Sequence, residues 1–241
     1  MAGHSKWNNI KRKKGAADAV KGKIFTKIGR EIQVAVKAGG DDPETNSALK
    51  DAIARARDNN MPNDNIKRSI KKAMGGDGEN YEVIQYEGYG PGGVAVLVRC
   101  LSDNRNRTAG DLRHIFDRNG GNLGTTGCVS FLFEEKGSMI LDRERFTDEE
   151  TVMMEAIEAG AEDMKVEQEY FEVLTSPEDY HEVKNNLEKM GYAFVEANLE
   201  PQPLNWTALS DPEAVENMEK LIEMLEDNDD VSHVWHNWEQ E

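Results

Sequence analysis

The chain has 241 residues, enough for two or three small domains with buried cores, and its 31% charged and 7% aromatic residues suit a soluble globular protein. Two cysteines are too few for a disulfide scaffold, and no apolar run is long enough to span a membrane, so we expect a cytoplasmic protein without a membrane partner. The net charge of −17, taken alone, would exclude most nucleic-acid-binding proteins, but this charge is unevenly distributed.

Positive charge is concentrated at the start of the chain. Residues 1–76 contain 17 Lys and Arg against 8 Asp and Glu, whereas residues 77–241 contain 12 against 38. Such asymmetry is typical of a nucleic-acid-binding segment attached to an acidic body. Residues 1–20 lack an apolar period, and we interpret them as a mobile basic arm that orders on a partner, with its tryptophan stacking on an unpaired base. The candidate binding residues of this arm are Lys6, Trp7, Lys11, Arg12, Lys13 and Lys14.

Three helices are predicted over residues 21–76, which would form a basic helical domain. The first extends from Lys21 to Ala38 and ends at Gly39-Gly40, and the second from Asn46 to Asn59. A third helix follows Pro62. We expect it to bury Ile66, Ile70, Ala73 and Met74 and to carry Lys67, Arg68, Lys71 and Lys72 on its other side. The candidate phosphate-binding cations of the first helix are Lys21, Lys23, Lys27, Arg30 and Lys37.

Two interpretations of these cations are possible. They could form a solvated polar face, as most charge runs do, or they could neutralise phosphates and release condensed counterions. In a strongly acidic protein, lysines are expected to lie near Asp and Glu residues that neutralise their charge. The first 30 residues instead carry nine Lys and Arg and only one acidic residue. We therefore favour phosphate binding.

Beyond Gly78 the apolar period changes towards 2, which indicates strands alternating with helices. The strands expected around the helix Thr108–Arg118 are Tyr81–Tyr89, Gly93–Leu101 and Cys128–Glu134. Further strands are expected at Ser138–Leu141, Tyr170–Leu174 and Tyr192–Leu199, with helices between them. After Pro201 and Pro203 the pattern predicts a strand near Leu204–Leu209, a helix that begins at Asp211-Pro212, and a strand at His233–Trp238.

The last β-α-β segment needs strand partners. Together with the β-α-β at residues 93–134 it would complete a βαββαβ, ferredoxin-like unit. The predicted fold is therefore α+β and multidomain, with an N-terminal three-helix domain followed by two α/β (ferredoxin-like) domains. Residues 77–134 plus 201–241 would form the middle domain, and residues 135–200 an acidic α/β domain inserted into it.

A second cationic candidate is the predicted loop Ser102–Thr108, which contains Arg105 and Arg107. These arginines could extend the phosphate-binding surface. Alternatively, the Asp and Asn side chains of the loop could cap the next helix while the arginines pair with local acids. The sequence leaves both interpretations open.

Other motifs give no sign of catalysis. The stretch Gly120–Gly127 follows a helix and opens a strand, which is the reverse of the order in a phosphate-binding loop. His233 and His236 lie three residues apart on a predicted strand and would face opposite sides of it. No nucleophile or metalloprotease motif occurs. We expect no catalytic residue, metal, cofactor or small-molecule substrate.

Several segments of the first 127 residues closely resemble the YebC/PmpR family. They are Met1–Trp7, Lys21–Lys27, Asn60-Met61-Pro62, Tyr86–Gly93, Ser102–Thr108 and Gly120–Gly124. The resemblance implies three domains, the last inserted into the middle one, and a regulator of gene expression that binds DNA. Because a mitochondrial relative is a translational activator and bacterial members are linked to ribosomes stalled on proline-rich sequences, it also implies an alternative, a translation factor on ribosomal RNA.

The residues themselves lean towards RNA as the partner. None of the three short helices shows the Asn-, Gln- and Arg-rich face of a helix that reads bases in the major groove. A flexible arm with Lys, Trp and Asn suits the irregular backbone of folded RNA. The acidic body would also be repelled by extended duplex DNA.

Overall fold

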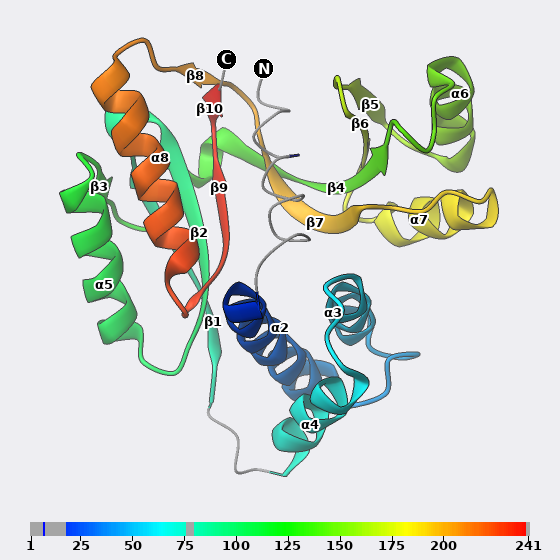
Figure 1. Ribbon diagram of the computed structural model, residues 1–241, viewed down its shortest axis with the longest axis horizontal. Coiled ribbons are helices and arrows are strands. Elements are labelled where there is room, and N and C mark those ends of the chain that lie inside the picture. The colour runs from blue at the N-terminus through cyan, green and yellow to red at the C-terminus, as the bar shows by residue number, and fades with distance from the viewer. Residues whose placement is uncertain (1–6, 8–17, 76–79, 240–241) are drawn as a thin grey trace. The chain divides into compact units, whose positions relative to one another are not determined.

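The computed structural model describes residue 7, residues 18–75 and residues 80–239 (Figure 1). Lys6 and the run Lys11–Lys14 lie outside the described residues. The chain divides into two compact units, each described here by itself. One contains residues 15–132 and 206–238, and the other contains residues 133–205 together with residues 1–14 and 239–241.

The first unit begins with three helices that share one core. They are α2 (Asp18–Gly39), α3 (Ser47–Asp58) and α4 (Asn63–Met74). Ile32 of α2 and Leu49 of α3 are fully buried in this core, and Ile66 of α4 packs against them. The side chain of Asn46 begins α3 by accepting a hydrogen bond from the Leu49 N–H, as a helix N-cap does.

Met74 was expected in this core, and that expectation is wrong, because its side chain is 59% exposed. Ile66 and Ala73 are buried and Ile70 is half-buried on the face of α4 that packs against α2. One residue step on a helix is about 100°. Met74, which follows Ala73, is therefore turned away from that face in the last turn.

A four-stranded antiparallel sheet forms the rest of this unit, in the order β3-β1-β2-β9. Its strands are β1 (Glu82–Tyr89), β2 (Ala95–Ser102), β3 (Asn122–Leu123) and β9 (Val231–His236). The helices α5 (Arg105–Arg118) and α8 (Pro212–Asp227) lie side by side over one face of the sheet (Figure 1). Alternate residues of β2 pack against both helices in one core.

The chain order within this sheet differs from the predicted βαββαβ. The order is β1-β2-α5-β3, followed after residue 205 by α8-β9, and no strand at residues 204–209 enters the sheet. There the chain forms only the two-residue strand β8 (Thr207–Ala208), which pairs with β10 (Trp238–Glu239). The middle region therefore has four antiparallel strands and two helices, but in a permuted chain order.

The predicted strand Cys128–Glu134 is also wrong. The chain there forms a short 3-10 helix, Ser130–Leu132, and the strand begins only at Phe133. The backbone N–H groups of Gly127, Val129 and Ser130 donate to the carboxylate of Glu87 at 2.8–2.9 Å. The buried carboxylate of Glu87 thus accepts hydrogen bonds from N–H groups that would otherwise have donated to a neighbouring strand.

Residues 133–205 form a domain with the βαββαβ order expected for the middle region. Its elements are β4 (Phe133–Asp142), α6 (Glu149–Ala159), β5 (Asp163–Val166), β6 (Tyr170–Thr175), α7 (Tyr180–Lys189) and β7 (Glu196–Pro203). The strand order is β5-β6-β4-β7, and all neighbours are antiparallel. Phe171, Tyr180 and Leu187 are fully buried between the sheet and the two helices. The α+β class, with N-terminal helices followed by α/β domains, is confirmed.

Candidate nucleic-acid interface

The cationic face of α2 contacts an acidic segment of the same compact unit. Lys23 forms an ion pair with Asp227, and the Nζ of Lys27 donates to the carbonyl oxygen of Glu226 at 2.5 Å. Arg30 donates through Nη1 to the carbonyl oxygen of Asp229 at 2.6 Å. Three of the five cations proposed on this helix therefore face protein carboxylates and carbonyls.

The segment that they contact is the C-terminal end of α8 and the turn after it. The last turn of α8 carries no basic residue, although a helix C-terminus has a partial negative charge and exposed carbonyl groups. Lys23 and Lys27 supply the missing positive charge from α2. The hydrogen bond to Asp227 raises the pKa of the exposed Lys23. The sequence showed these lysines opposite an apolar stripe, but the partner lies about 200 residues away.

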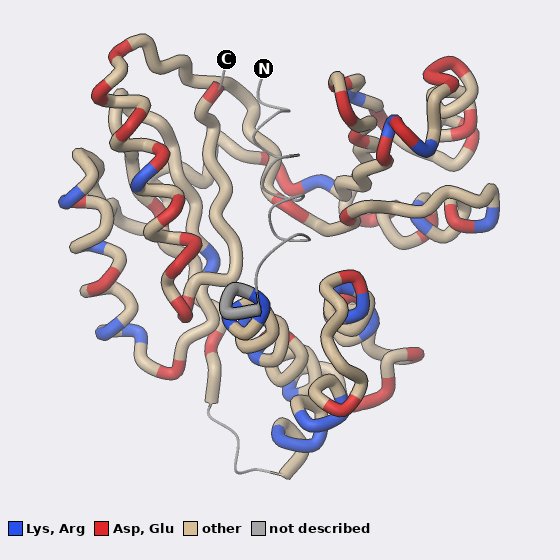
Figure 2. The backbone as a smooth tube through the Cα atoms, viewed as in Figure 1, with Lys and Arg blue, Asp and Glu red and all other residues tan. Residues whose placement is uncertain are grey.

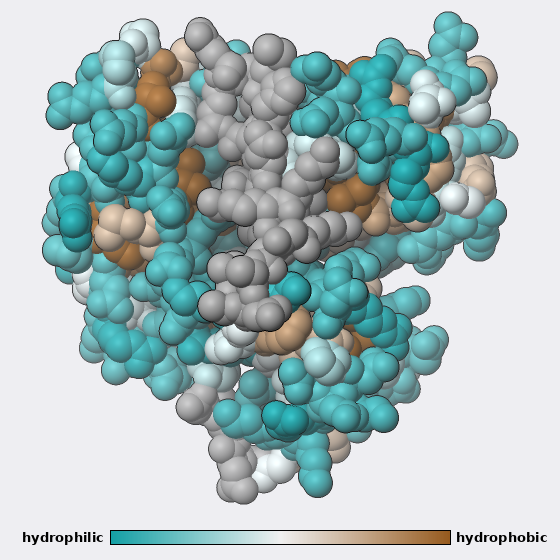
Figure 3. Space-filling model, in the orientation of Figure 1, coloured by the Kyte–Doolittle hydropathy of each residue, from teal (hydrophilic) through white to brown (hydrophobic). Residues whose placement is uncertain are grey.

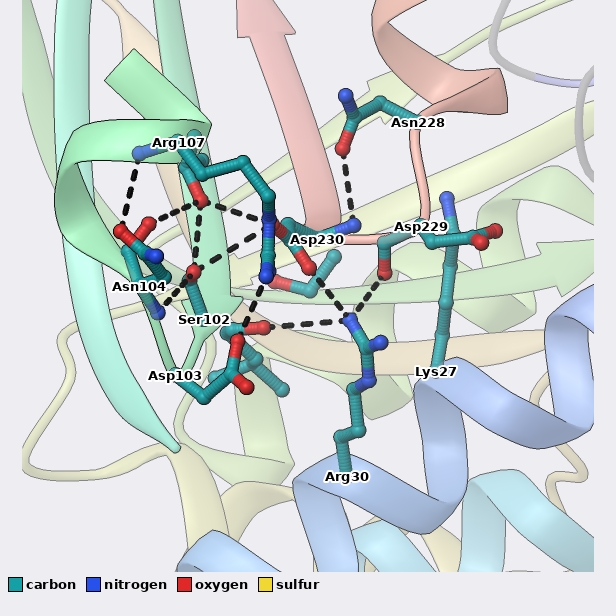
Figure 4. A network of polar contacts seen from close by, with 12 residues as sticks. Lys27, Arg30, Ser102, Asp103, Asn104, Arg107, Asn228, Asp229 and Asp230 are labelled. Carbon is teal, nitrogen blue, oxygen red and sulfur yellow. Dashed lines mark hydrogen bonds and ion pairs between the residues drawn. The ribbon is translucent and has the colours of Figure 1, made fainter. Parts of the chain in front are cut away.

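Asp230 is the centre of a buried polar network (Figure 4). Its carboxylate accepts hydrogen bonds from Arg30 Nη1 at 2.9 Å, Arg107 Nη2 at 2.9 Å and Thr108 Oγ1 at 2.8 Å. Burial alone would raise the pKa of Asp230, but the hydrogen bonds from Arg107, Thr108 and Arg30 outweigh it and lower the pKa. Two arginines thus share one buried carboxylate.

Beside this network is a polar pocket of about 420 Å³. Arg30, Arg107 and Tyr81 line it, and the guanidinium of Arg30 lies over the Tyr81 ring at 4.9 Å from the centroid. The pocket is also lined by Asp103, Asp111, Asp229 and Asp230. Four carboxylates beside two guanidinium groups leave no excess of positive charge for a phosphate.

Arg105 and Arg107 lie in the first turn of α5, and not in a loop, because Asn104 begins the helix by accepting from the Arg107 N–H at 3.1 Å. Arg107 also forms ion pairs with Asp103 and Asp230, at 2.8 and 2.9 Å. Hydrogen bonds to these two acids raise the pKa of Arg107. Arg105 is exposed, and its carbonyl oxygen accepts from the Tyr86 hydroxyl. Of the two arginines, Arg105 alone has its side chain available to an outside partner.

The stacking role expected for Trp7 disagrees with the structure. Trp7 is 2% exposed and stacks on Tyr170, with ring centroids 5.5 Å apart. Ile140 and Val195 of the inserted domain pack around the same pair. A side chain buried in this way cannot also stack on a base, so Trp7 packs on residues 133–205 instead.

Lys37 and Lys21 are the remaining candidates on α2. Lys37 is exposed and donates to the side-chain oxygen of Asn80 at 3.3 Å, while Lys21 is half-buried near the start of the helix. Both stay candidates for an outside partner.

Helix α4 has a cationic face whose residues were not among the nucleic-acid-binding residues predicted from the sequence. Lys67, Arg68, Lys71 and Lys72 are all exposed, on the side opposite the buried Ile66 and Ala73. Among the residues that the structure describes, Lys67, Arg68 and Lys71 form no ion pair. The signal was visible in the sequence as four cations within six residues, but the stronger charge of the first 30 residues obscured it. Figure 2 shows the contrast between this blue helix and the red residues along α8.

The glycine-rich stretch 120–127 holds an anion of the protein itself. Glu87 is buried, and three backbone N–H groups of this region donate to its carboxylate. Burial would raise the pKa of Glu87, but the N–H groups of Gly127, Val129 and Ser130 lower it. Gly120 and Gly127 have positive φ of 71° and 88°, as turns require. The backbone N–H groups at and just after the end of this stretch therefore bind a carboxylate of the protein itself.

Two absences also bear on function. No helix within the described ranges 18–75 and 80–239 is long and apolar enough to cross a membrane. In the same part of the chain, no group of three or more His, Cys, Asp or Glu side chains could hold a metal ion.

Comparisons with known proteins place the chain in a family. Residues 5–76 match the model described as "TACO1/YebC protein N-terminal domain", and residues 81–238 match "TACO1/YebC second and third domain". Proteins named "Probable transcriptional regulatory protein" are 60% identical in Acetivibrio thermocellus, with 99% of each chain covered, and 60% identical in Ruminiclostridium cellulolyticum, with 100% and 98% covered.

A solved structure gives the same answer for the fold. The crystal structure of a conserved hypothetical protein from Aquifex aeolicus is 46% identical, with a TM-score of 0.86 over 92% of this chain and 91% of the other. Both family models together cover nearly the whole chain. The chain therefore belongs to the TACO1/YebC family.

Proposed function

We propose that this protein is a non-enzymatic regulator of gene expression that binds nucleic acid through its N-terminal helical region. The observation that carries the proposal is the face of α4, where Lys67, Arg68 and Lys71 are exposed beside one another. Residues three and four apart on a helix are neighbours, so these side chains form a continuous row that extends about 6 Å along the helix axis. Such a row can neutralise adjacent phosphates of one strand and release their counterions.

The proposal also includes the basic arm, whose Lys6 and Lys11–Lys14 precede α2 in the chain. Lys21, Lys37 and Arg105 stay in the candidate set as well. Lys23, Lys27, Arg30 and Arg107 leave the candidate surface, because carboxylates and carbonyls of the protein bind them. The names of the relatives agree with a regulatory role.

The test is the salt dependence of binding. The full chain and a variant with Lys67→Gln, Arg68→Gln and Lys71→Gln are titrated with a labelled duplex DNA and a labelled RNA hairpin at several salt concentrations. Each lost phosphate contact should reduce the slope of log K against log salt by about 0.7–0.9. A matched control with Arg145→Gln, Lys184→Gln and Lys189→Gln removes the same charge from the inserted domain.

The control separates a local contact from a general change in net charge. We expect the α4 variant to lose affinity and slope on its preferred polymer while the control keeps both. Equal slopes for the wild-type chain, the α4 variant and the control would show that this face makes no phosphate contact.

The negative charge of α8 supports a second candidate partner, a folded RNA such as ribosomal RNA, over duplex DNA. Glu213, Glu216, Glu219 and Glu223 are exposed along this helix, in the same compact unit as α4. An extended duplex would experience repulsion from such a surface, whereas a folded RNA that contacts one end would not. A translation factor on ribosomal RNA predicts co-sedimentation with ribosomes when elongation is stalled. A transcriptional regulator predicts about tenfold or greater preference for one promoter over scrambled DNA.

A further inference from the structure

Helix α6 of the inserted domain carries large apolar residues on its outer side as well as on the side that faces the core. Val152, Ala156 and Ala159 are buried against the domain core. On the outer side, Met153 is 38% exposed, Met154 65% and Ile157 65%. A surface helix usually presents charged and polar residues outward, and an all-round apolar helix is usually buried. The outer side of α6 therefore exposes large apolar side chains that folding of this domain alone does not require.

These three side chains form one patch. Met153 and Ile157 are four residues apart and Met154 and Ile157 three apart, so all three are neighbours on the helix surface. Exposed apolar residues that occur singly, such as Phe131 and Leu204, need no such explanation. The face of the molecule drawn in Figure 3 is largely hydrophilic, with only small separate hydrophobic areas.

Acidic side chains surround the patch. Glu149, Glu150 and Glu158 are exposed on the same helix. Glu149 is held by Arg143 Nη2 at 3.0 Å, whereas Glu150 and Glu158 have no ion pair among the described residues. Glu155 instead accepts a hydrogen bond from the Tyr192 hydroxyl. The whole of residues 133–205 contains 20 Asp and Glu against 6 Lys and Arg.

We propose that the outer face of α6 binds a cationic amphipathic segment of a partner protein. Its apolar side chains would pack on Met153, Met154 and Ile157, and its Lys or Arg side chains would lie against Glu150 and Glu158. Methionine is flexible and polarizable, so a methionine-rich surface adapts to different apolar side chains. The acidic rim excludes nucleic acid from this face and favours basic partners. The residues of this site differ from those of the proposed nucleic-acid surface.

The probe is a synthetic helical peptide of about 18 residues, with leucines on one face and lysines on the other. Its binding to the full-length protein is measured by fluorescence anisotropy. Two further peptides serve as controls: one with the same composition in scrambled order, and one with glutamate in place of lysine. We expect saturable binding of the first peptide in the micromolar range, and no saturable binding of the other two.

Two variants locate the site. M154S with I157S should weaken binding by about tenfold or more, because it removes the central apolar contacts. E150Q with E158Q should weaken it by a few-fold and reduce its salt dependence. F131S with L204S removes comparable exposed apolar groups elsewhere and should leave the affinity unchanged. Circular dichroism checks that each variant is folded.

Three results would overturn the proposal. Binding could survive M154S with I157S unchanged, or the acidic or scrambled peptide could bind as well as the cationic one. Sedimentation could show instead that the wild-type chain self-associates and that M154S with I157S abolishes this, which would assign the face to a second copy. Binding of nucleic acid should be unaffected in all α6 variants, so the outcome is independent of the proposed function.

Discussion

The cationic faces of α2 and α4 look alike in sequence and differ in what they contact. Each helix carries a row of Lys and Arg opposite an apolar stripe. On α2, Lys23, Lys27 and Arg30 bind the acidic end of α8 and the turn that follows it. On α4, Lys67, Arg68 and Lys71 are exposed without an ion pair in the part of the chain that the structure describes. The same pattern can therefore form an internal joint or an outside surface.

A row of cations on a helix indicates a surface that binds anions. It does not indicate whether those anions belong to the protein or to a partner. In α2 the anions are supplied by residues 226–230 of the same chain. The contact also fixes three helices to the edge of a sheet that forms from residues far along the sequence. Four predictions follow the contrast, from the largest expected effect on stability to the smallest.

The largest effect is expected at Asp230. Asp230→Ala leaves Arg30 and Arg107 near one another without their shared carboxylate, and removing one partner of a buried ion pair costs about 3–5 kcal/mol. The free energy of unfolding, measured in urea, should fall by that amount. Asp229→Ala is the control. It removes an exposed side chain but keeps the backbone carbonyl that accepts from Arg30, so the free energy of unfolding should fall far less. Equal losses for the two variants would contradict the role assigned to Asp230.

The second prediction concerns pH. The pKa of Asp230 is lower in the fold than in the unfolded chain, so the unfolded state binds the proton more tightly. The stabilisation is present above the unfolded pKa of about 3.9 and is lost as pH falls through the lower folded pKa. Glu87 acts in the same direction.

Unfolding in urea at several pH values below about 4.5 tests this directly. The wild-type free energy of unfolding should decrease as the solution becomes more acidic. Asp230→Asn should be less stable at neutral pH and should show a shallower decrease, with the part from Glu87 remaining. An unchanged slope in Asp230→Asn would mean that Asp230 titrates as in the unfolded chain.

The third prediction weakens the joint from the side of α2. Arg30→Gln removes hydrogen bonds to a charged carboxylate, which are worth about 1.5–3 kcal/mol, but it leaves Arg107 paired with Asp230. Its loss of unfolding free energy should lie below that of Asp230→Ala. Lys23→Gln, at an exposed ion pair, should cost less still. A larger loss for Lys23→Gln than for Arg30→Gln would reverse the order of importance inferred from burial.

The fourth prediction sharpens the contrast between the two helices. The triple α4 variant should leave the free energy of unfolding within about 0.5 kcal/mol of wild type, because its side chains are exposed. Its affinity for nucleic acid should fall. The variant with Lys23→Gln and Lys27→Gln should instead lower the free energy of unfolding. It should leave the affinity for nucleic acid and its salt slope unchanged. Loss of slope in the α2 variant would show that nucleic acid displaces the segment 226–230.

Local patterns were sufficient for much of the fold. The period of the apolar residues predicted α2 and α3 closely, and the Asn46 cap and the Gly39-Gly40 stop lie where local chemistry places them. The strands that became β1 and β2 were predicted within two residues at each end. These elements depend on contacts between near neighbours, which the sequence displays directly.

The errors occur where distant residues decide. The stretch 128–134 has strand-like composition, but Glu87 takes its N–H groups. The short strand β5 was missed because four residues carry little periodic signal. Trp7 was expected on a nucleic-acid base and is instead buried on Tyr170. For residues 128–134 and for Trp7 the deciding partner is far away in sequence, and no local pattern identifies it.

A basic helical start, an acidic remainder and an α+β class follow from the order of the residues alone, because charge and periodicity are additive properties of neighbouring residues. Which cations are used internally depends on the tertiary contacts. Long-range contacts pair Lys23 with Asp227 and Lys27 with Glu226, and both Arg30 and Arg107 with Asp230. The side chains of Lys67, Arg68 and Lys71 stay exposed at the surface. A charge is satisfied by whatever lies within a few ångströms of it, and that distance is set by the fold.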